Sequence, residues 1–144
     1  MRRILGHYDQ NERTIILGDM NSISHLDNVQ LRNLSQATQS SHMVQGKLDV
    51  RVSRFLEEAG FVDAYAALHD GKPEPTIPTA AARTSKFSPA RLDYIYVSSD
   101  LRKSIASIEV LRTEDTECAS DHYPLVMDLT DHGRNGQVPP ESIT

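Results

Sequence analysis

The stretch that decides the fold runs from Thr14 to Ser22 and reads TIILGDMNS. Its first four residues are β-branched or apolar and are followed by Gly18, a pattern that indicates a buried β-strand rather than a helix. Asp19 and Asn21 follow at the carboxyl end of this strand, and residues two apart in extended chain point to the same side. Their oxygens suit activation of a water and contact with a phosphate oxygen or a metal. A strand followed by an Asx turn explains the same residues.

A second predicted strand spans residues 91–97 and reads RLDYIYV. Asp93 lies within this apolar and aromatic run, where burial of an unpaired carboxylate is strongly unfavourable. The residue therefore needs a partner or a position that faces solvent. A salt bridge to Arg91 is one solution. A hydrogen bond to a histidine such as His122 is another, and it would fix the tautomer of that histidine and stabilise its charged form.

The third acidic segment is SDHYP at residues 120–124, which precedes a predicted strand at residues 125–129. Adjacent side chains diverge, so Asp121 would point toward a cation while His122 would act on a proton or a phosphate oxygen. An Asp-His pair in a turn is also a common structural feature. Taken together, the three segments fit a site for phosphoester hydrolysis. The remaining histidines are expected to be structural: His7, His25, His42, His69 and His132.

The composition favours one soluble globular domain. The chain has 144 residues, of which 38% are hydrophobic, enough for a core of its own. A net charge of -5 argues against a pure DNA-binding module, although cations held by carboxylates can supply positive charge at a phosphoester site. No run approaches the roughly 20 apolar residues of a membrane span, and the start does not read as a secretory signal, so a cytoplasmic location is expected. Cys118 alone forms neither an intrachain disulfide nor a thiolate zinc site.

The segments between these motifs give a coarser pattern. Residues 47–59 carry apolar side chains at helical spacing before Gly60, which predicts a helix. Residues 69–89 contain four prolines and predict an extended loop. The other predicted elements are a strand at 105–111, a loop with one short helix at 22–45, and a disordered tail at 131–144.

The segments ILGDMNS, RLDYIYVS and ASDHYPLV, with AGFVDAY between the first two, resemble the endonuclease/exonuclease/phosphatase family of metal-dependent phosphoesterases. The resemblance implies that Asp19 orients or deprotonates the attacking water and that Asn21 binds the scissile phosphate or a metal. It implies that Asp93 holds His122, whose protonated ring stabilises charge on the phosphate. It also implies a divalent metal, magnesium or manganese, bound by Asp19, Asn21 and Asp121.

The resemblance implies a fold of the α/β class, in which two sheets pack face to face. Residues 1–130 resemble only the C-terminal portion of that domain, so we expect half of a two-sheet α/β sandwich: one mainly antiparallel or mixed sheet with flanking helices. The Asn and Glu of the earlier half have no counterpart here. The inner face of this sheet would be exposed and apolar, and such a face favours association with a partner. We therefore expect a fragment, or one part of a split enzyme, whose partner is the missing N-terminal half.

The leading functional hypothesis is metal-dependent hydrolysis of phosphodiester or phosphomonoester bonds, with a site that is incomplete in this chain alone. The motifs do not choose among nucleic acid, a phospholipid headgroup and a small phosphate ester as the substrate, because selectivity lies in loops. The alternative is a noncatalytic α/β interaction module. An esterase with a nucleophilic serine is disfavoured, since the sequence has no Gly-x-Ser-x-Gly elbow.

Overall fold

The computed structural model describes residues 13–70, 72–82 and 86–130. The tail predicted to be disordered, 131–144, lies outside the described residues. The strands are β1 (Ile15–Asp19), β2 (Met43–Val44), β3 (Lys47–Leu48), β4 (Phe61–Asp63), β5 (Asp93–Ser98), β6 (Ile105–Val110) and β7 (Leu125–Leu129). The α-helices are α2 (Gln36–His42), α3 (Arg51–Glu58), α4 (Ala64–His69) and α5 (Glu114–Ala119). Short 3-10 helices cover His25–Asp27, Leu31–Asn33, Ala80–Ala82 and Ser99–Ser104.

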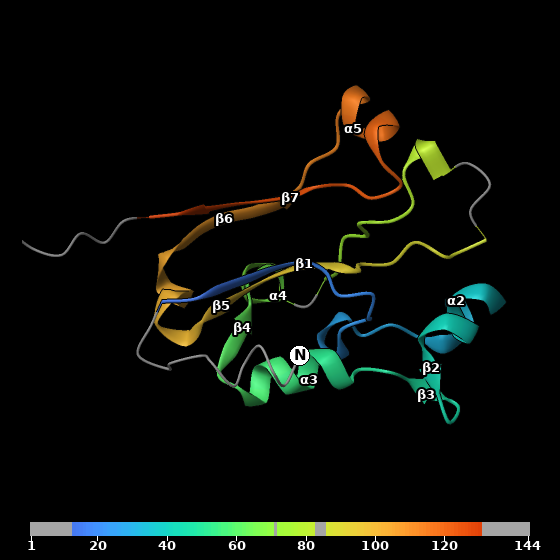
Figure 1. Cartoon of the computed structure of the whole chain (residues 1–144), viewed down its shortest axis with the longest axis horizontal. Helices are drawn as coiled ribbons and strands as arrows, with labels where there is room; N and C mark the ends of the chain where they lie inside the picture. The colour runs from blue at the N-terminus through green and yellow to red at the C-terminus, as the bar shows by residue number, and fades with distance from the viewer. Residues whose placement is uncertain (1–12, 71, 83–85, 131–144) are drawn as a thin grey trace, which may run out of the picture.

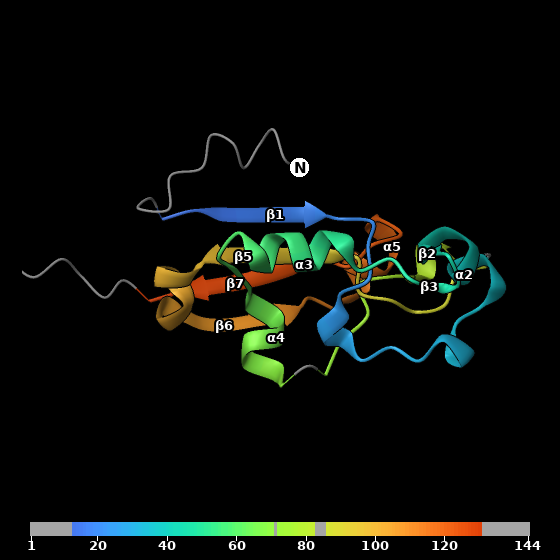
Figure 2. The ribbon, with the colours of Figure 1, turned by 90° about the horizontal axis from the view of Figure 1, so that it is seen from below.

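The central sheet has three antiparallel strands in the order β1-β5-β4. A separate antiparallel pair, β6-β7, lies on one side of it, and α3 lies on the other (Figure 1). The view from below shows α3 running along the sheet beside β1 and β5 (Figure 2). The predicted α/β class, with antiparallel sheets and flanking helices, is therefore confirmed and is consistent with a partial α/β sandwich.

The middle strand, β5, supplies a core on each of its faces because successive side chains point to opposite sides. Ile95 and Val97 pack with Ile108 and Val110 of β6 and with α4. Tyr94 and Tyr96 instead pack with Leu56 of α3 and Phe61 of β4. Strand β5 is thus covered on both faces, which explains its almost continuous apolar sequence.

The outer strand of the central sheet is β1. In the described part of the chain only β5 pairs with it, so its second edge is open there. Leu17 stands opposite Ile95 in the ladder, so its side chain shares the face that carries the β6-β7 pair. Yet Leu17 is 68% exposed and Ile15 is 39% exposed. The sheet therefore presents an apolar strip at this edge.

The predicted strands are confirmed to within about two residues, but the predicted helix at 47–59 begins only at Arg51. Lys47 pairs with Val44 in a hairpin, and Gln45 and Gly46 both have positive φ angles, as a tight two-residue turn requires. Strand β4 and helices α4 and α5 were not predicted, and each is six residues or shorter. No helix in the described ranges combines the length and apolar character that crossing a bilayer requires.

Candidate active site

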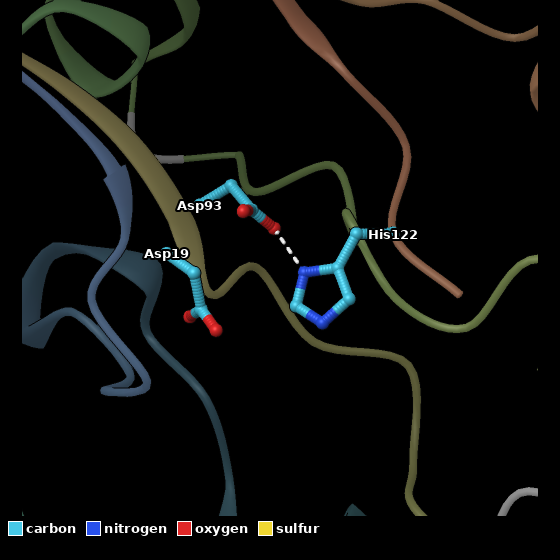
Figure 3. Close-up of side chains that lie close together, drawn as sticks. All are labelled: Asp19, Asp93 and His122. Atoms are coloured by element: carbon cyan, nitrogen blue, oxygen red, sulfur yellow. Dashed lines mark hydrogen bonds and ion pairs between the residues drawn. The ribbon is translucent and has the colours of Figure 1, made fainter. Parts of the chain in front are cut away.

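The carboxyl end of β1, the start of β5 and the turn before β7 meet at one end of the central sheet (Figure 1). Asp19 and Asp93 are direct partners in the β1-β5 ladder. Ligand atoms of Asp19, Asp93 and His122 all lie within 4.8 Å of one another. Figure 3 shows the three side chains converging from these separate segments. The first two predicted segments and the third thus come together as expected.

Asp93 and His122 are joined directly, with 2.8 Å between the Asp93 Oδ2 and His122 Nδ1 atoms. A carboxylate only accepts hydrogen bonds, so Nδ1 donates, and Nε2 lies on the part of the ring away from Asp93 (Figure 3). The alternative prediction, a salt bridge between Asp93 and Arg91, is wrong. The guanidinium of Arg91 donates instead to Asp27 and Asp63. Asp93 therefore orients the ring of His122 and supports its charged form.

The pKa of His122 is raised above its usual value. Partial burial lowers the pKa, because it disfavours the charged ring. The hydrogen bond and charge of Asp93 raise it, and the charges of Asp19 and Asp121 add to this effect. The carboxylates outweigh the burial, so the fold favours the protonated form of His122.

Asp19 and Asn21 form a compact turn at the end of β1. The Asn21 amide nitrogen donates to Asp19 Oδ1 at 2.7 Å, and Asn21 has a φ of 45°. The Asx turn considered from the sequence is therefore present. It does not remove the pair from the site, because both residues line a cavity of about 470 Å³ that also contains Asp121 and His122.

A family comparison bears on this arrangement. The model of the Endonuclease/Exonuclease/phosphatase family matches residues 2–122. The chain belongs to this family. Its members are in general hydrolytic enzymes that use a divalent metal. A search of curated protein sequences gave no match.

The donor set fits the divalent metal of the family. Asp19 and Asp121 offer carboxylates and Asn21 offers a carboxamide oxygen, which are the ligands that magnesium and manganese prefer. The three side chains whose ligand atoms lie within 4.8 Å of one another form a different set: Asp19, Asp93 and His122. Asp121 lines the same cavity but does not belong to that group. The assignment of Asp19, Asn21 and Asp121 as metal ligands stays a prediction.

A second cluster of charged side chains is buried and is centred on Arg91. Arg91 has no exposed side-chain surface, and its Nη2 lies 2.5 Å from Asp27 Oδ1 and 2.6 Å from Asp63 Oδ2. The Arg91 guanidinium also stacks over the Tyr94 ring, 4.5 Å from its centroid. Asp63 accepts in addition from the Tyr65 amide at the start of α4. The cluster therefore ties the residues preceding β5 to the 3-10 helix after β1 and to α4.

Two threonines of the proline-rich loop connect the parts of the site, and no sequence pattern indicated this role. The fully buried Thr76 Oγ1 accepts from the Asp93 amide at 3.2 Å, while its carbonyl oxygen accepts from the Tyr123 amide at 2.8 Å. The Thr79 hydroxyl donates to the Ser120 carbonyl. The loop thus fixes β5 and the turn that carries His122 relative to each other.

The histidines expected to be structural behave differently from one another. His69 Nε2 lies 2.9 Å from the Ile108 carbonyl oxygen and its ring stacks on Tyr65, which is a structural role. His25 Nε2 lies 3.0 Å from Oε2 of Glu57. His42 lines the cavity of the candidate site, which the sequence did not indicate. His7 and His132 lie outside the described residues.

Proposed function

We propose that the chain carries a metal-dependent phosphoester hydrolase site, with magnesium or manganese as the cation. One observation carries the proposal: the Asp93–His122 hydrogen bond of 2.8 Å lies beside Asp19 in an open cavity. This arrangement holds an imidazole whose pKa is raised beside the exposed carboxylate of Asp19. Hydrolysis of a phosphoester is promoted by a base that takes a proton from the attacking water and by a positively charged group beside the phosphate oxygens.

Each side chain has a separate task in this proposal. Asp19 orients the water and accepts its proton, and Asn21 donates its amide hydrogens to a phosphate oxygen. His122 donates from Nε2 to the phosphate while Asp93 holds its Nδ1 proton. Asp19, Asn21 and Asp121 would hold the cation. When bound, the cation supplies positive charge that stabilises the phosphate oxygens in the transition state.

The direct test is magnesium-dependent cleavage of bis(p-nitrophenyl) phosphate and p-nitrophenyl phosphate. His122→Asn and Asp19→Asn are each expected to lower turnover by about 10²–10⁴-fold. Asp70→Asn is the matched control, because asparagine also tolerates the left-handed backbone of Asp70 at the end of α4. If magnesium binds normally and both site variants turn over as fast as the control, the proposed chemistry is wrong.

We also propose that full activity needs a further segment that pairs with the open edge of β1, namely an N-terminal half of the family domain. The exposed Leu17 and Ile15 support this, since an apolar edge strand favours pairing. The segment can belong to the same polypeptide or to a second chain. Joining it should slow amide exchange in β1 and raise metal-dependent turnover.

The noncatalytic interaction module remains the competing proposal, and the same open edge favours it. The two differ in a single outcome. If the joined protein protects β1 from exchange but shows no magnesium-dependent turnover on either substrate, the chain acts as a binding partner. Turnover that depends on His122 excludes that role as the sole function.

A further inference from the structure

The turn that carries His122 gives the ring of this residue little support of its own. The His122 side chain is 27% exposed, and in the described part of the chain its ring forms one hydrogen bond, to Asp93 (Figure 3). The next residue, Tyr123, is only 5% exposed and packs in the core with strands β5 and β6. Because adjacent residues share a rigid peptide plane, the backbone at Tyr123 limits where the His122 ring can lie. The contacts of Tyr123 therefore help to fix the geometry of the site.

Tyr123 is held at three points. Its amide nitrogen donates to the Thr76 carbonyl oxygen at 2.8 Å. Its hydroxyl donates to Oε1 of Glu117 at 2.5 Å, and the central carbon of the Arg112 guanidinium lies 3.9 Å from the centroid of its ring. A hydrogen bond to a carboxylate is roughly twice as strong as one between neutral groups. The contact with Glu117 is therefore a strong, directional restraint on the side chain.

Glu117 and Arg112 bind the proline-rich loop as well as Tyr123. Oε2 of Glu117 accepts from the Ala80 amide at 2.9 Å, and Nη2 of Arg112 donates to the Pro75 carbonyl oxygen at 2.6 Å. The hydrogen bonds from Tyr123 and Ala80 lower the pKa of Glu117, so its carboxylate is ionised near pH 7 and both of its oxygens accept. The two side chains therefore hold Tyr123 against this loop.

Helix α5 places Glu117 in this position. The helix has six residues and none is buried, so the burial of an apolar face does not explain its presence. It begins at a capping box in which the side chains of Thr113 and Thr116 each accept from the amide of the other. Its Glu117 side chain reaches both the turn and the loop. The helix therefore serves to hold this carboxylate beside Tyr123.

We propose that Tyr123 and Glu117 are positioning residues of the phosphoester site: their hydrogen bond fixes the turn that carries His122 and so keeps its ring on Asp93. The inference rests on the proposed function, in which the His122 ring acts on the phosphate. Neither Tyr123 nor Glu117 lines the cavity, so both act through His122 rather than on the substrate. A misplacement of about 1 Å in a site can lower turnover by about 10²-fold.

The competing explanation is that Tyr123 is only a core residue. Its ring belongs to the same apolar cluster as Tyr65, which is 4% exposed and whose hydroxyl also donates to a glutamate, Glu74, at 3.4 Å. Tyr65 lies on α4 and not beside the turn. Tyr65→Phe is therefore the matched control, because it removes a tyrosine hydroxyl from the same core without releasing the turn.

The first measurement does not depend on turnover. In protein that carries isotopically labelled histidine and is kept in chelator, NMR follows the Nδ1 proton that His122 donates to Asp93. Tyr123→Phe keeps the aromatic ring but loses the hydroxyl, and Glu117→Gln keeps the side-chain length but loses the charge. Each should make this proton exchange with water about two- to tenfold faster, the range that one hydrogen bond supports. Tyr65→Phe should leave the exchange rate unchanged.

The second measurement is magnesium-dependent turnover of bis(p-nitrophenyl) phosphate. Tyr123→Phe and Glu117→Gln should each lower kcat by roughly tenfold and change KM by less than about twofold, because neither residue touches the substrate. The double variant should lose no more than either single variant, since both changes break the same hydrogen bond. Tyr65→Phe should retain the kcat of the parent chain.

Two results would overturn the inference. If Tyr123→Phe and Glu117→Gln leave the Nδ1 proton and kcat as they are in the parent chain, Tyr123 is only a core residue. If the two losses add in full in the double variant, the residues do not act through a shared hydrogen bond. Failure of the proposed function is a separate outcome. If the parent chain turns over no phosphoester, that function is wrong, and the exchange of the Nδ1 proton alone decides whether the Tyr123–Glu117 hydrogen bond holds His122.

Discussion

Two clusters in this molecule contain the same kinds of side chain, two aspartates and one base, but differ in how far they are closed. In the first, Arg91 is enclosed by Asp27 and Asp63, and the three side chains are 0%, 2% and 1% exposed. In the second, His122 meets Asp93 and Asp19. There the His122 and Asp93 side chains are 27% and 19% exposed, and Asp19 is exposed to solvent.

The difference lies in unused bonding capacity. Arg91 donates through both terminal nitrogens and Nε to its carboxylates, so the closed cluster has little left to offer a ligand. The open cluster has one hydrogen bond between its three side chains. It also places two carboxylates directly opposite each other in the β1-β5 ladder, an arrangement that disfavours folding. The closed cluster supports the fold, and the open one retains capacity for a cation or a phosphate.

The largest expected effect comes from removing the base of the closed cluster. Arg91→Met leaves two buried carboxylates without a counter-charge, so the free energy of unfolding should fall by about 3–5 kcal/mol. Urea denaturation followed by circular dichroism measures this. Arg91→Lys keeps the charge but loses the bidentate contacts. Its free energy of unfolding should lie between those of Arg91→Met and the parent chain. An unchanged denaturation midpoint in Arg91→Met would show that the cluster contributes nothing to stability.

The second effect concerns the loop that connects the start of β5 with the turn that carries His122. Thr76→Val removes the hydroxyl that accepts from the Leu92 and Asp93 amides and leaves both donors buried. We expect a loss of about 1–3 kcal/mol in the free energy of unfolding. Thr76→Ser retains the oxygen and is the matched control. If Val and Ser variants unfold at the same urea concentration, water replaces the threonine hydroxyl.

The sequence predicted the open cluster better than the closed one. Asp19, Asp93 and His122 each stand next to an apolar strand, so strand ends alone bring them to one edge. Asp27 and Asp63 lie 64 and 28 residues from Arg91, and no local pattern links them. Thr76 and His42 escaped detection for a similar reason, because their roles depend on tertiary burial within segments that read as polar loop. Short elements such as α4 form because Asp63 caps the helix and the core covers it, not because of a long periodic pattern.

A third and smaller effect tests whether the open cluster lowers stability. Asp19→Asn removes one of the two opposed charges in the β1-β5 ladder, while asparagine can still form the turn to Asn21. Without a divalent cation, the variant should be more stable than the parent chain by roughly 0.2–1 kcal/mol. Adding magnesium should reverse the order, because the parent gains more from the bound cation. A variant less stable than the parent in chelator would mean that Asp19 stabilises the fold through His122.

The smallest expected effect is a shift in the pKa of one side chain, His122 of the open cluster. The pKa of His122 is raised in the fold against the effect of burial, largely by the hydrogen bond and charge of Asp93. Asp93→Asn should therefore lower this pKa, observed as a shift in the proton NMR titration of the ring in chelator. The pKa of His42 should be the same in this variant, since it depends on burial and on the charge of Asp19.

The raised pKa of His122 also predicts how the stability of the fold depends on pH. A group with a raised folded-state pKa stabilises the fold fully below its unfolded pKa, and this contribution disappears as the pH rises through the folded pKa. The parent chain should lose that contribution over the range in which His122 titrates, and Asp93→Asn should lose less because less is present. If both proteins show the same pH dependence of unfolding, the Asp93–His122 bond does not hold the proton, and the open cluster differs from the closed one in exposure alone.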